Sequence, residues 1–532
     1  MMTRLLLSPD RLSAALPAAL ASAALLALAM PGRVGWWPLL FFALVPLLFV
    51  ALYQRPGRSA LAGFVFGLVY HLALLYWILI VLGRYGGLPV WLSVPALILL
   101  ALYLACYPAV FCLLLTLVAG RFWNRERSVA PLVWAAPVLW TGLDYLRGLL
   151  LTGFPWMDIG YGLYGQPRLI QAADLGGHFL ITFGVVLTNS LLLGMIDRQR
   201  RAVRWNIRRE RWLLLGAVGL LVFLGGYSLV RYQVVDTIVN RSMRAKVAVI
   251  QGNIDQAIKW SPDAKTKTVD DYIRLSLQAL EEGDVELVVW PETALPFYLE
   301  EDPLIHRVFD FSSQQNTLLL TGVPFYQKSS TGEGEASFRF YNGAALIGPG
   351  GRLAGLYAKQ HLVPFGEYVP LRGALPFLQP LVVNIDDFSA GSTPEPLVEG
   401  VLKLGVLICY ESIFPDIARE SVRLGGNLLV NITNDAWYGR SSAPWQSMAM
   451  TVFRAVENKR ALVRSANTGI SGLVDPLGRV GRQTDLFVPA FGVGAVPLLD
   501  IPTVFGRNGH QFGMFCALFI PLVLLGRSRE RA

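Results

Sequence analysis

Cys409 is the residue of this sequence with the clearest potential for covalent chemistry. It ends an apolar, strand-like run, LKLGVLIC (402–409), and the YESIFPDIARE that follows has a helical pattern with Pro415 in its first turn. A thiol beside the start of a helix lies where the helix dipole stabilises a thiolate. A buried structural cysteine fits the same position, so the position alone leaves both interpretations open.

A nucleophilic thiol needs a base, and Glu292 is the best candidate. It follows the strand-like run ELVVW in the segment WPETALPF, where apolar neighbours suit a carboxyl group to proton transfer. A glutamate that merely begins a helix is the alternative. Histidine is the more usual base, but His306 and His510 do not lie at a convincing strand end, and His306 fits a surface helix. His361 stays open because it is close in sequence to a third candidate segment.

That third segment is YAKQHLVPFGEYVP, which contains Lys359 and Glu367. A lysine among apolar residues can act as a fixed cation for the oxyanion of an acyl-transfer reaction. Glu367 could hold its ammonium group in place. The alternative is a solvated lysine at a strand end with an unrelated glutamate in a loop.

Taken together, WPET, KQHLVPFGEYVP and CYESIFPD resemble the Glu–Lys–Cys signature of the nitrilase-like carbon–nitrogen hydrolase superfamily. The separations are 67 residues from Glu292 to Lys359 and 50 residues from Lys359 to Cys409. HLVPFGEYVP, CYE and NDAWYG, set between seven apolar segments and a final one, resemble the apolipoprotein N-acyltransferase family more narrowly. The resemblance extends over essentially the whole chain.

This resemblance implies an α/β fold, an αββα nitrilase-like sandwich inserted in a polytopic α-helical membrane domain with about eight spans. It also implies a reaction in which an acyl chain moves from a membrane phospholipid to the N-terminal amine of a diacylglyceryl-cysteine apolipoprotein. The roles that it assigns are nucleophile for Cys409, general base for Glu292, oxyanion partner for Lys359, second carboxylate for Glu367, acyl-pocket residues for Tyr410 and Glu411, and aromatic residues at the site mouth for Trp260 and Trp437.

The composition independently indicates a membrane protein. Of the 532 residues, 54% are hydrophobic and 16% are charged, against about 25% charged in a typical soluble chain. The net charge of +9 is uneven: residues 246–510 hold 22 Lys and Arg against 28 Asp and Glu, and the excess elsewhere is entirely arginine. Arginine confined to the ends of apolar segments is a membrane orientation signal, which excludes a nucleic-acid-binding role.

Eight apolar runs are candidates for membrane spans of roughly 20 residues. The fourth run is too long for one straight span and contains Pro95 and Pro108, and the fifth is short because Asp144 and Arg147 interrupt it. The runs are Leu12–Met30, Gly35–Tyr53, Ala60–Leu82, Leu88–Ala119, Ala130–Leu143, Phe179–Ile196, Trp212–Val230 and Phe512–Gly526.

The arginine distribution predicts the orientation. With the N-terminus inside, the inner segments hold 17 arginines and the outer segments 7, so we expect both termini inside. The predicted organisation is a transmembrane domain over 1–230, a catalytic domain over 246–500 and a C-terminal transmembrane helix over 510–526. We expect a multi-pass protein of the Gram-negative inner membrane with a periplasmic catalytic domain. Because Ala27-Leu28-Ala29 resembles a cleavage site, a signal peptide is the alternative for the first span.

The segment 246–510 alternates strand-like and helical patterns, which favours an α/β layered domain. GPGGRLAG (348–355) is typical of a hairpin turn, and Gln327–Ser337 is the best candidate for a flexible loop. The expected strands are 246–254, 286–290, 317–325, 402–409 and 427–434, and the expected helices are Asp270–Glu282, Asp416–Leu424 and Trp445–Leu462.

No CxxC, HExxH or P-loop motif is present, so we expect no metal or other cofactor. The expected partners are a phospholipid acyl donor, a diacylglyceryl-apolipoprotein acceptor and the membrane, with the chain acting as a monomer. Two alternatives stay open. A membrane-tethered amidase or lipase would use the same thiol with water as acceptor. A transporter with an external binding module would need charged residues within its spans, where Asp144 and Arg147 are exceptions to an otherwise apolar pattern.

Overall fold

The computed structural model describes residues 12–126, 130–201, 207–256, 258–328, 338–364, 366–368 and 388–525. The chain divides into two compact units. The first contains residues 1–78, 91–233 and 508–532, and the second contains residues 79–90 and 234–507.

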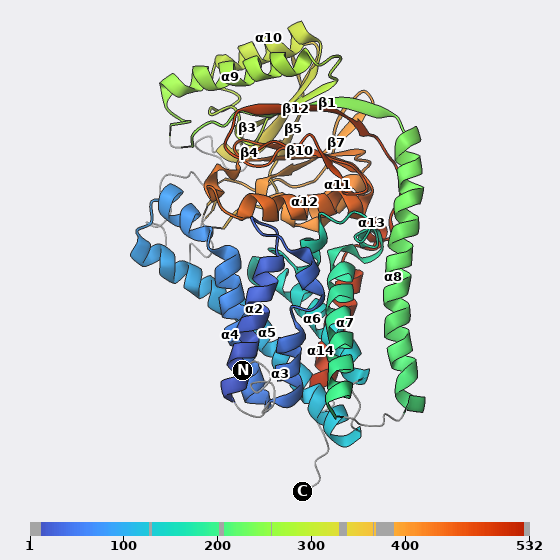
Figure 1. Ribbon diagram of the computed structural model, residues 1–532. Helices are drawn as coiled ribbons and strands as arrows, with labels where there is room; N and C mark the ends of the chain where they lie inside the picture. The colour runs from blue at the N-terminus through green and yellow to red at the C-terminus, as the bar shows by residue number, and fades with distance from the viewer. Residues whose placement is uncertain are drawn as a thin grey trace. The chain divides into compact units, whose positions relative to one another are not determined.

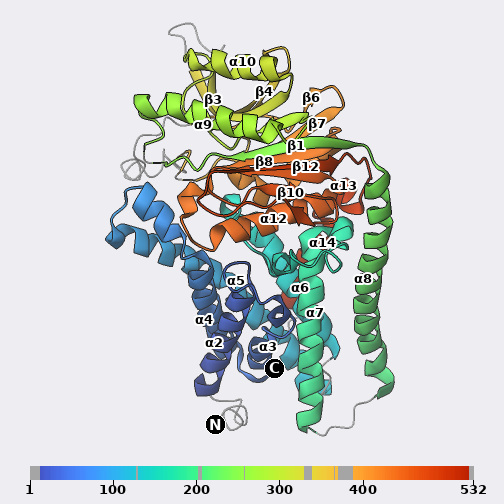
Figure 2. The same cartoon turned by 45° about the horizontal axis from the view of Figure 1, so that its top comes forward.

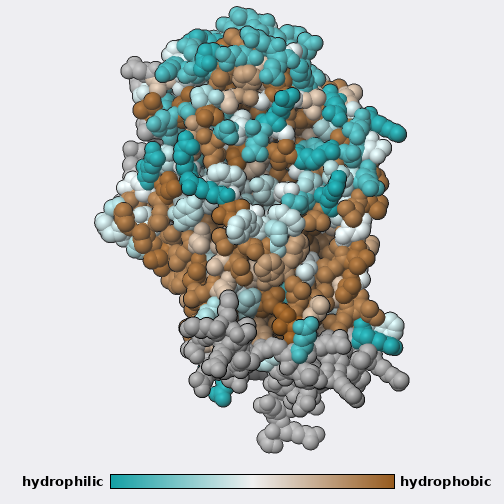
Figure 3. All heavy atoms as spheres, in the orientation of Figure 1, coloured by the Kyte–Doolittle hydropathy of each residue, from teal (hydrophilic) through white to brown (hydrophobic). Residues whose placement is uncertain are grey.

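The first unit is helical (Figure 1). Its helix α2 contacts α3 and α4, and α6 contacts both α7 and α14. On the face shown in Figure 3, hydrophobic side chains gather over these helices. The longer helices of this unit are α2 (Leu12–Ala29), α3 (Val45–Tyr53), α4 (Pro56–Leu75), α5 (Val90–Glu126), α6 (Ala130–Arg147), α7 (Ala173–Arg201), α8 (Ile207–Arg241, which continues into the second unit) and α14 (Gln511–Leu525).

Within the described residues, four helices are long and apolar enough to cross a membrane. They lie in α4, α5, α7 and α8, and three shorter apolar helices are found over 14–29, 37–53 and 511–522. The second predicted span is broken into a 3-10 helix, η1 (Trp37–Phe41), and α3. The fourth is one continuous helix despite Pro95 and Pro108. The total of eight spans therefore stays a prediction.

The charges that interrupt the fifth predicted span belong to a buried ion cluster inside the first unit. Arg147 is 4% exposed and pairs with both Asp158 and Asp144, the latter at 3.5 Å. Asp158 also contacts the ring of His178 at 2.8 Å. Opposite charges thus compensate one another, as buried ions require. The charges that interrupt the predicted span are therefore paired with one another inside the first unit.

The second unit is built on two six-stranded sheets. The first has the order β12-β1-β2-β3-β4-β5 and the second β11-β10-β9-β8-β7-β6. In each sheet three neighbouring strands are parallel, β1-β2-β3 and β7-β8-β9, and antiparallel strands flank them. The strands are β1 (Arg244–Gln251), β2 (Leu287–Val289), β3 (Leu318–Lys328), β4 (Phe338–Gly348), β5 (Arg352–Ala358), β6 (Leu397–Glu399), β7 (Leu402–Ile408), β8 (Leu428–Thr433), β9 (Ala461–Ala466), β10 (Gly472–Val474), β11 (Val480–Gly481) and β12 (Ala490–Pro497).

One apolar core joins these two sheets, with buried side chains from both, such as Val249 and Leu320 from the first sheet and Val406 and Val430 from the second. Helices α9 (Pro262–Leu280) and α10 (Leu304–Gln315) cover the outer face of the first sheet, and α11 (Pro415–Arg423) and α12 (Ala443–Asn458) cover that of the second (Figure 2). The central strands β2, β8 and β9 are buried along their whole length, which is why they appear in the sequence as nearly continuous apolar runs. The predicted αββα sandwich is confirmed.

Several local predictions changed in the structure. The predicted helix Trp445–Leu462 ends at Asn458, because Lys459 takes a left-handed conformation with φ 49° and the chain turns into β9. The hairpin turn predicted at 348–355 joins β4 to β5, with Gly351 at φ 65°. Of the predicted loop Gln327–Ser337, the first two residues belong to β3, and 329–337 lie outside the described residues.

Candidate active site

The three residues predicted to carry the chemistry each follow the end of a strand in the second unit. Glu292 comes three residues after β2, Lys359 directly follows β5 and Cys409 directly follows β7. Strands β2 and β7 are fixed by their buried apolar side chains, whereas β5 is held by its pairing with β4, and each polar residue appears where the regular hydrogen-bonded ladder stops. The two sheets of the sandwich therefore supply different parts of one site, with Glu292 and Lys359 from the first and Cys409 from the second.

Glu292, Lys359 and Glu367 form a buried charge cluster. The ammonium nitrogen of Lys359 lies 2.9 Å from Oε1 of Glu367 and 3.7 Å from Oε1 of Glu292. The Lys359 side chain is 1% exposed. Burial opposes its charge, but the carboxylates of Glu367 and Glu292 outweigh that cost and hold the pKa of Lys359 well above its usual value. Lys359 is therefore a permanently charged, fixed cation.

Asn342 joins the two carboxylates. Its side-chain amide, on β4, donates to Oε1 of Glu292 at 2.9 Å and to Oε1 of Glu367 at 2.7 Å. The other oxygen of Glu292 accepts from the backbone N–H of Asn434 at 2.9 Å, and that of Glu367 accepts from Val363 at 2.8 Å. Both carboxylates are thus held in one orientation. Sequence reasoning missed Asn342, because it lies within a strand and belongs to no motif.

Cys409 has a strained backbone conformation. Its φ is 52°, in the left-handed region that a residue with a side chain rarely adopts, and it begins the 3-10 helix η6 (Cys409–Ile413). Burial and the negative charge of Glu292 raise the pKa of its thiol to about 12, while the charge of Lys359 and a hydrogen bond with Thr433 lower it. The charges of Glu292 and Lys359 therefore act on the sulfur, and the resting thiol is protonated near neutral pH.

Glu411 holds the loop after Lys359 in place. Its carboxylate is 0% exposed and accepts from the backbone N–H groups of Ile408 at 2.7 Å, Gln360 at 2.6 Å and His361 at 3.3 Å. The hydroxyl of Tyr357 donates to both of its oxygens at 3.1 Å. These contacts tie the end of β7 to the end of β5, so Glu411 shapes the site through the backbone on both sides of it.

A cluster of three aromatic side chains, those of His361, Tyr410 and Phe414, lies next to this loop. The ring of Tyr410 is 5.1 Å from that of Phe414, and His361 is 3.8 Å from Phe414 between ring centroids. Burial, with a further contribution from Lys359, lowers the pKa of His361 to about 4. His361 is therefore neutral near pH 7 and packs as an aromatic side chain. His306 is an exposed residue of α10, as its pattern predicted.

The two predicted tryptophans occupy different environments. Trp260 lies in a turn and is 48% exposed. Trp437 belongs to η7 (Asp435–Tyr438), and its ring is 5.6 Å from Tyr85, in a T-shaped arrangement. Tyr85 ends the π-helix η2 (Ile80–Tyr85), which belongs to the second unit although its neighbours in sequence belong to the first. The predicted role of both tryptophans in substrate binding stays a prediction.

Lys259, next to Trp260, is a buried cation that sequence reasoning did not single out. It is 0% exposed, and within the described part of the chain its ammonium group has no hydrogen-bond partner. Burial lowers the pKa of Lys259 to about 8, an effect that the charge of Glu292 partly offsets. The unfolded chain, with a lysine pKa of about 10.4, holds this proton more tightly than the folded protein.

Lys259→Met should therefore stabilise the protein at pH 7. It removes the charge and keeps most of the volume, so we expect the free energy of unfolding to rise by about 3 kcal/mol. This gain is complete below pH 8 and should shrink as the pH rises toward about 10.4, where the unfolded chain also loses the proton. Thermal unfolding of the detergent-solubilised protein at pH 7 and at higher pH measures it. Lys403→Met, at an exposed position, is the control; a lower midpoint for Lys259→Met at pH 7 would contradict the argument.

The second unit has two sheets whose outer faces are covered by helices, and it carries glutamate, lysine and cysteine at or just beyond the ends of their strands. This fold and this site together define a carbon–nitrogen hydrolase domain. The family model described as "Carbon-nitrogen hydrolase" matches residues 246–499. The model described as "Apolipoprotein N-acyltransferase N-terminal domain" matches residues 22–191.

Similar curated proteins extend over nearly the whole chain. Apolipoprotein N-acyltransferase of Geobacter metallireducens is 41% identical over 501 residues, which is 94% of this chain and 92% of that protein. The enzyme of the same name from Azotobacter vinelandii is 35% identical over 97% of this chain and 95% of its own. The chain therefore belongs to the apolipoprotein N-acyltransferase family. Among solved structures, Saccharomyces cerevisiae Nit3, from branch 10 of the nitrilase superfamily, covers 54% of this chain and 97% of its own, with 18% identity and a TM-score of 0.38.

Proposed function

We propose that this protein transfers an acyl chain from a membrane phospholipid to the N-terminal amine of a diacylglyceryl-cysteine apolipoprotein, through a thioester on Cys409. The observation that carries the proposal is the environment of Cys409, a thiol on which the charges of a fixed carboxylate, Glu292, and a fixed ammonium, Lys359, both act. The name of the family's curated members gives an apolipoprotein as acceptor and a nitrogen as the acylated atom. A phospholipid donor fits the long apolar helices of the first unit.

In the first step Glu292 takes the thiol proton while the sulfur of Cys409 attacks the ester carbonyl carbon of the phospholipid. A sulfur–carbon bond forms, the ester carbon–oxygen bond breaks, and Glu292 returns the proton to the departing alkoxide of the lysophospholipid. The negative charge that develops on the carbonyl oxygen is balanced by Lys359. Because Glu367 holds this ammonium group, it is oriented before the reaction begins.

In the second step the uncharged α-amine of the acceptor attacks the thioester carbon. A nitrogen–carbon bond forms and the sulfur–carbon bond breaks. The surplus proton on nitrogen passes through Glu292 to the sulfur, which restores the thiol of Cys409. The amine must lose its ammonium proton to solvent before it attacks, so this step should accelerate as the pH rises toward the pKa of the acceptor amine, about 8.

A hydrolase would follow the same first step and use water in the second. The surroundings of the site favour the transferase, because the aromatic side chain of Tyr410, directly after Cys409, is more than nine-tenths buried and packs against Phe414, which limits access of water. The helical unit offers a second reason. A soluble amide has no need of long apolar helices, whereas a phospholipid donor resides in a bilayer.

The acceptor distinguishes the two reactions. We expect enzyme loaded with phospholipid alone to keep its acyl group, and to discharge it rapidly onto a diacylglyceryl-cysteine peptide with a free α-amine. The N-acetylated form of the same peptide should not discharge it, because its nitrogen is an amide. Intact-mass measurement after removal of donor, together with assays of free fatty acid and acylated peptide, follows both products. Fatty-acid release at a rate indifferent to the peptide would favour the hydrolase.

We also propose that the chain is a multi-pass protein of the inner membrane with residues 246–500 in the periplasm. The support is the asymmetry of 17 inner against 7 outer arginines, since cytoplasmic loops are enriched in positive charge. Reporter domains inserted between Arg198 and Arg211 or fused after Ala532 should report the cytoplasm. A reporter inserted within 329–337 should report the periplasm, and a cytoplasmic signal there would overturn the orientation.

A further inference from the structure

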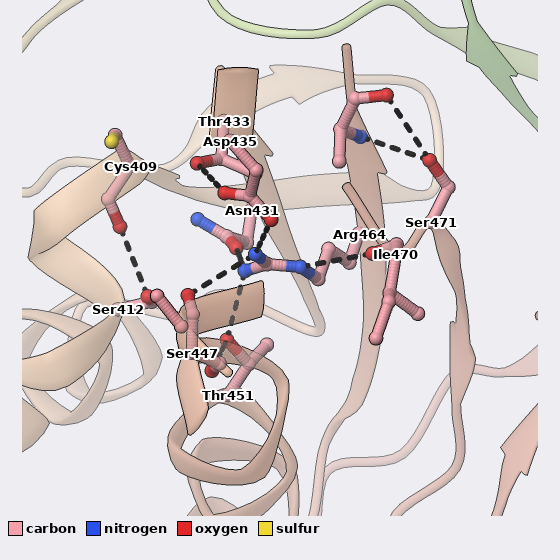
Figure 4. Close-up of polar contacts among 12 residues, drawn as sticks. Cys409, Ser412, Asn431, Thr433, Asp435, Ser447, Thr451, Arg464, Ile470 and Ser471 are labelled. Atoms are coloured by element: carbon pink, nitrogen blue, oxygen red, sulfur yellow. Dashed lines mark hydrogen bonds and ion pairs between the residues drawn. The ribbon is translucent and has the colours of Figure 1, made fainter. Parts of the chain in front are cut away.

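A buried polar network lies beside Cys409 in the second sheet (Figure 4). Its centre is Arg464, on β9, which is 0% exposed. The guanidinium group donates to Oδ2 of Asp435 at 2.9 Å. It also contacts the side-chain oxygen of Asn431, the hydroxyls of Ser447 and Thr451 at 3.1 Å each and the backbone oxygen of Ile470 at 3.1 Å.

This network fixes a buried negative charge close to the nucleophile. Asp435 is 0% exposed and pairs with Arg464 through only one of its oxygens. The other oxygen, Oδ1, accepts a hydrogen bond of 2.9 Å from the hydroxyl of Thr433. A buried carboxylate with a fixed cation on one side and a hydroxyl on the other is stable without solvent. Asp435, itself held by Arg464, therefore orients the hydroxyl of Thr433.

Thr433 is also the neighbour of Cys409 across the sheet. Strands β7 and β8 are parallel, and their last paired residues are Ile408 and Ile432, which directly precede Cys409 and Thr433. Thr433 is the last residue of β8, whereas Cys409 leaves the ladder and begins η6. A hydrogen bond between Thr433 and Cys409 lowers the pKa of the thiol, in the same direction as the charge of Lys359. Thr433 thus lies beside the strand end that carries the reacting sulfur, and its hydroxyl bonds to the buried carboxylate (Figure 4).

A hydroxyl group has one proton to donate and two lone pairs that accept. While Cys409 is a thiol, the proton of Thr433 goes to Asp435, as the structure shows, and the oxygen can accept from the S–H group. When Glu292 removes the thiol proton, the sulfur becomes an acceptor. We propose that Thr433 is a further catalytic residue, whose hydroxyl turns from Asp435 to the sulfur as Cys409 ionises, while Arg464 holds the carboxylate left behind.

No covalent bond of Thr433 breaks in this step, because the thiol proton goes to Glu292 and the hydroxyl only rotates. Asp435 and Arg464 act as positioning residues, since Asp435 holds the hydroxyl of Thr433 and Arg464 holds the carboxylate of Asp435. The inference rests on the proposed role of Cys409 as nucleophile. It adds a stabilising donor from the second sheet to the groups that Glu292 and Lys359 supply from the first.

The test compares Thr433→Val, which keeps the shape and removes the hydroxyl, with Thr433→Ser, which keeps the hydroxyl. Two rates are measured in each variant: alkylation of Cys409 by iodoacetamide between pH 7 and 10, located by peptide mass, and thioester formation with phospholipid. A hydrogen bond to a charged group is worth a factor of roughly ten to a hundred. We expect Thr433→Val to slow both rates by that factor, and Thr433→Ser to remain within a few-fold of the wild type.

Thr317→Val is the matched control. Thr317 is a buried threonine whose hydroxyl donates to the backbone oxygen of Val285 at 2.8 Å, at the start of β3 and outside the network. Thr317→Val also loses a buried hydroxyl group, and it should leave the alkylation rate of Cys409 unchanged. Equal alkylation rates in Thr433→Val and wild type, or an equal defect in Thr433→Ser, would overturn the proposal. Absence of a thioester in the wild type would instead contradict the proposed function, since alkylation does not depend on it.

Discussion

Cys409→Ala is expected to abolish acyl loading, with a fall of several orders of magnitude in the rate of transfer, as the loss of a covalent nucleophile causes. The sulfur is the atom on which the charges of Glu292 and Lys359 act, and alanine leaves the rest of the site in place. The fold should survive, because alanine fits the space of the thiol and the φ of 52° is no harder for alanine than for cysteine. Intact mass after incubation with phospholipid measures the loading.

The control replaces the other three cysteines together. Cys106, Cys112 and Cys516 are free and lie on helices of the first unit. A variant that keeps Cys409 alone should still gain one acyl chain. Acyl mass that persists in Cys409→Ala, or that maps to a serine, would show that another group is the nucleophile.

Glu292→Gln is expected to have the second largest effect, and its two consequences have opposite signs. Removal of the general base should slow thioester formation by roughly 10²–10⁴. The negative charge of Glu292 also raises the pKa of Cys409, so its loss should lower that pKa and increase the fraction of thiolate at a given pH. Alkylation of Cys409 by iodoacetamide should therefore become faster while acyl loading becomes slower.

This divergence separates a base from a merely structural glutamate. Glu292 accepts hydrogen bonds from Asn342 and Asn434 on different oxygens, and glutamine can replace only one of them. Asn342→Ala is the matched variant, because it removes one of these contacts and keeps the carboxylate. We expect a smaller loss of acyl loading in Asn342→Ala than in Glu292→Gln. A parallel fall of both rates in Glu292→Gln would show that this residue acts on Cys409 through structure alone.

Elements with a local cause could be predicted from the sequence. The strands before Glu292 and Cys409 are nearly continuous apolar runs because their side chains are almost all buried, and such runs are visible without a structure. The strand before Lys359 is mostly half-buried or exposed and was not predicted. The motifs around these residues then indicated the αββα sandwich and the family, which the comparisons confirm. The position of the helix end at Asn458 was missed, because the polar residues Glu457–Arg460 fit an amphipathic helix as well as a turn, and the left-handed backbone of Lys459 decides between them.

Only the tertiary structure decided which side chains meet. Asn342 contacts carboxylates 50 and 25 residues away, and Thr433 reaches Cys409 because β7 and β8 are paired in a particular register. Arg464 sits in a strand whose other side chains are buried, and its charge is tolerated because Asp435 lies opposite it. Hydrogen bonds of this kind depend on distances between strands, to within a fraction of an ångström. Sequence periodicity reports which face of a strand is buried and carries no information about such distances.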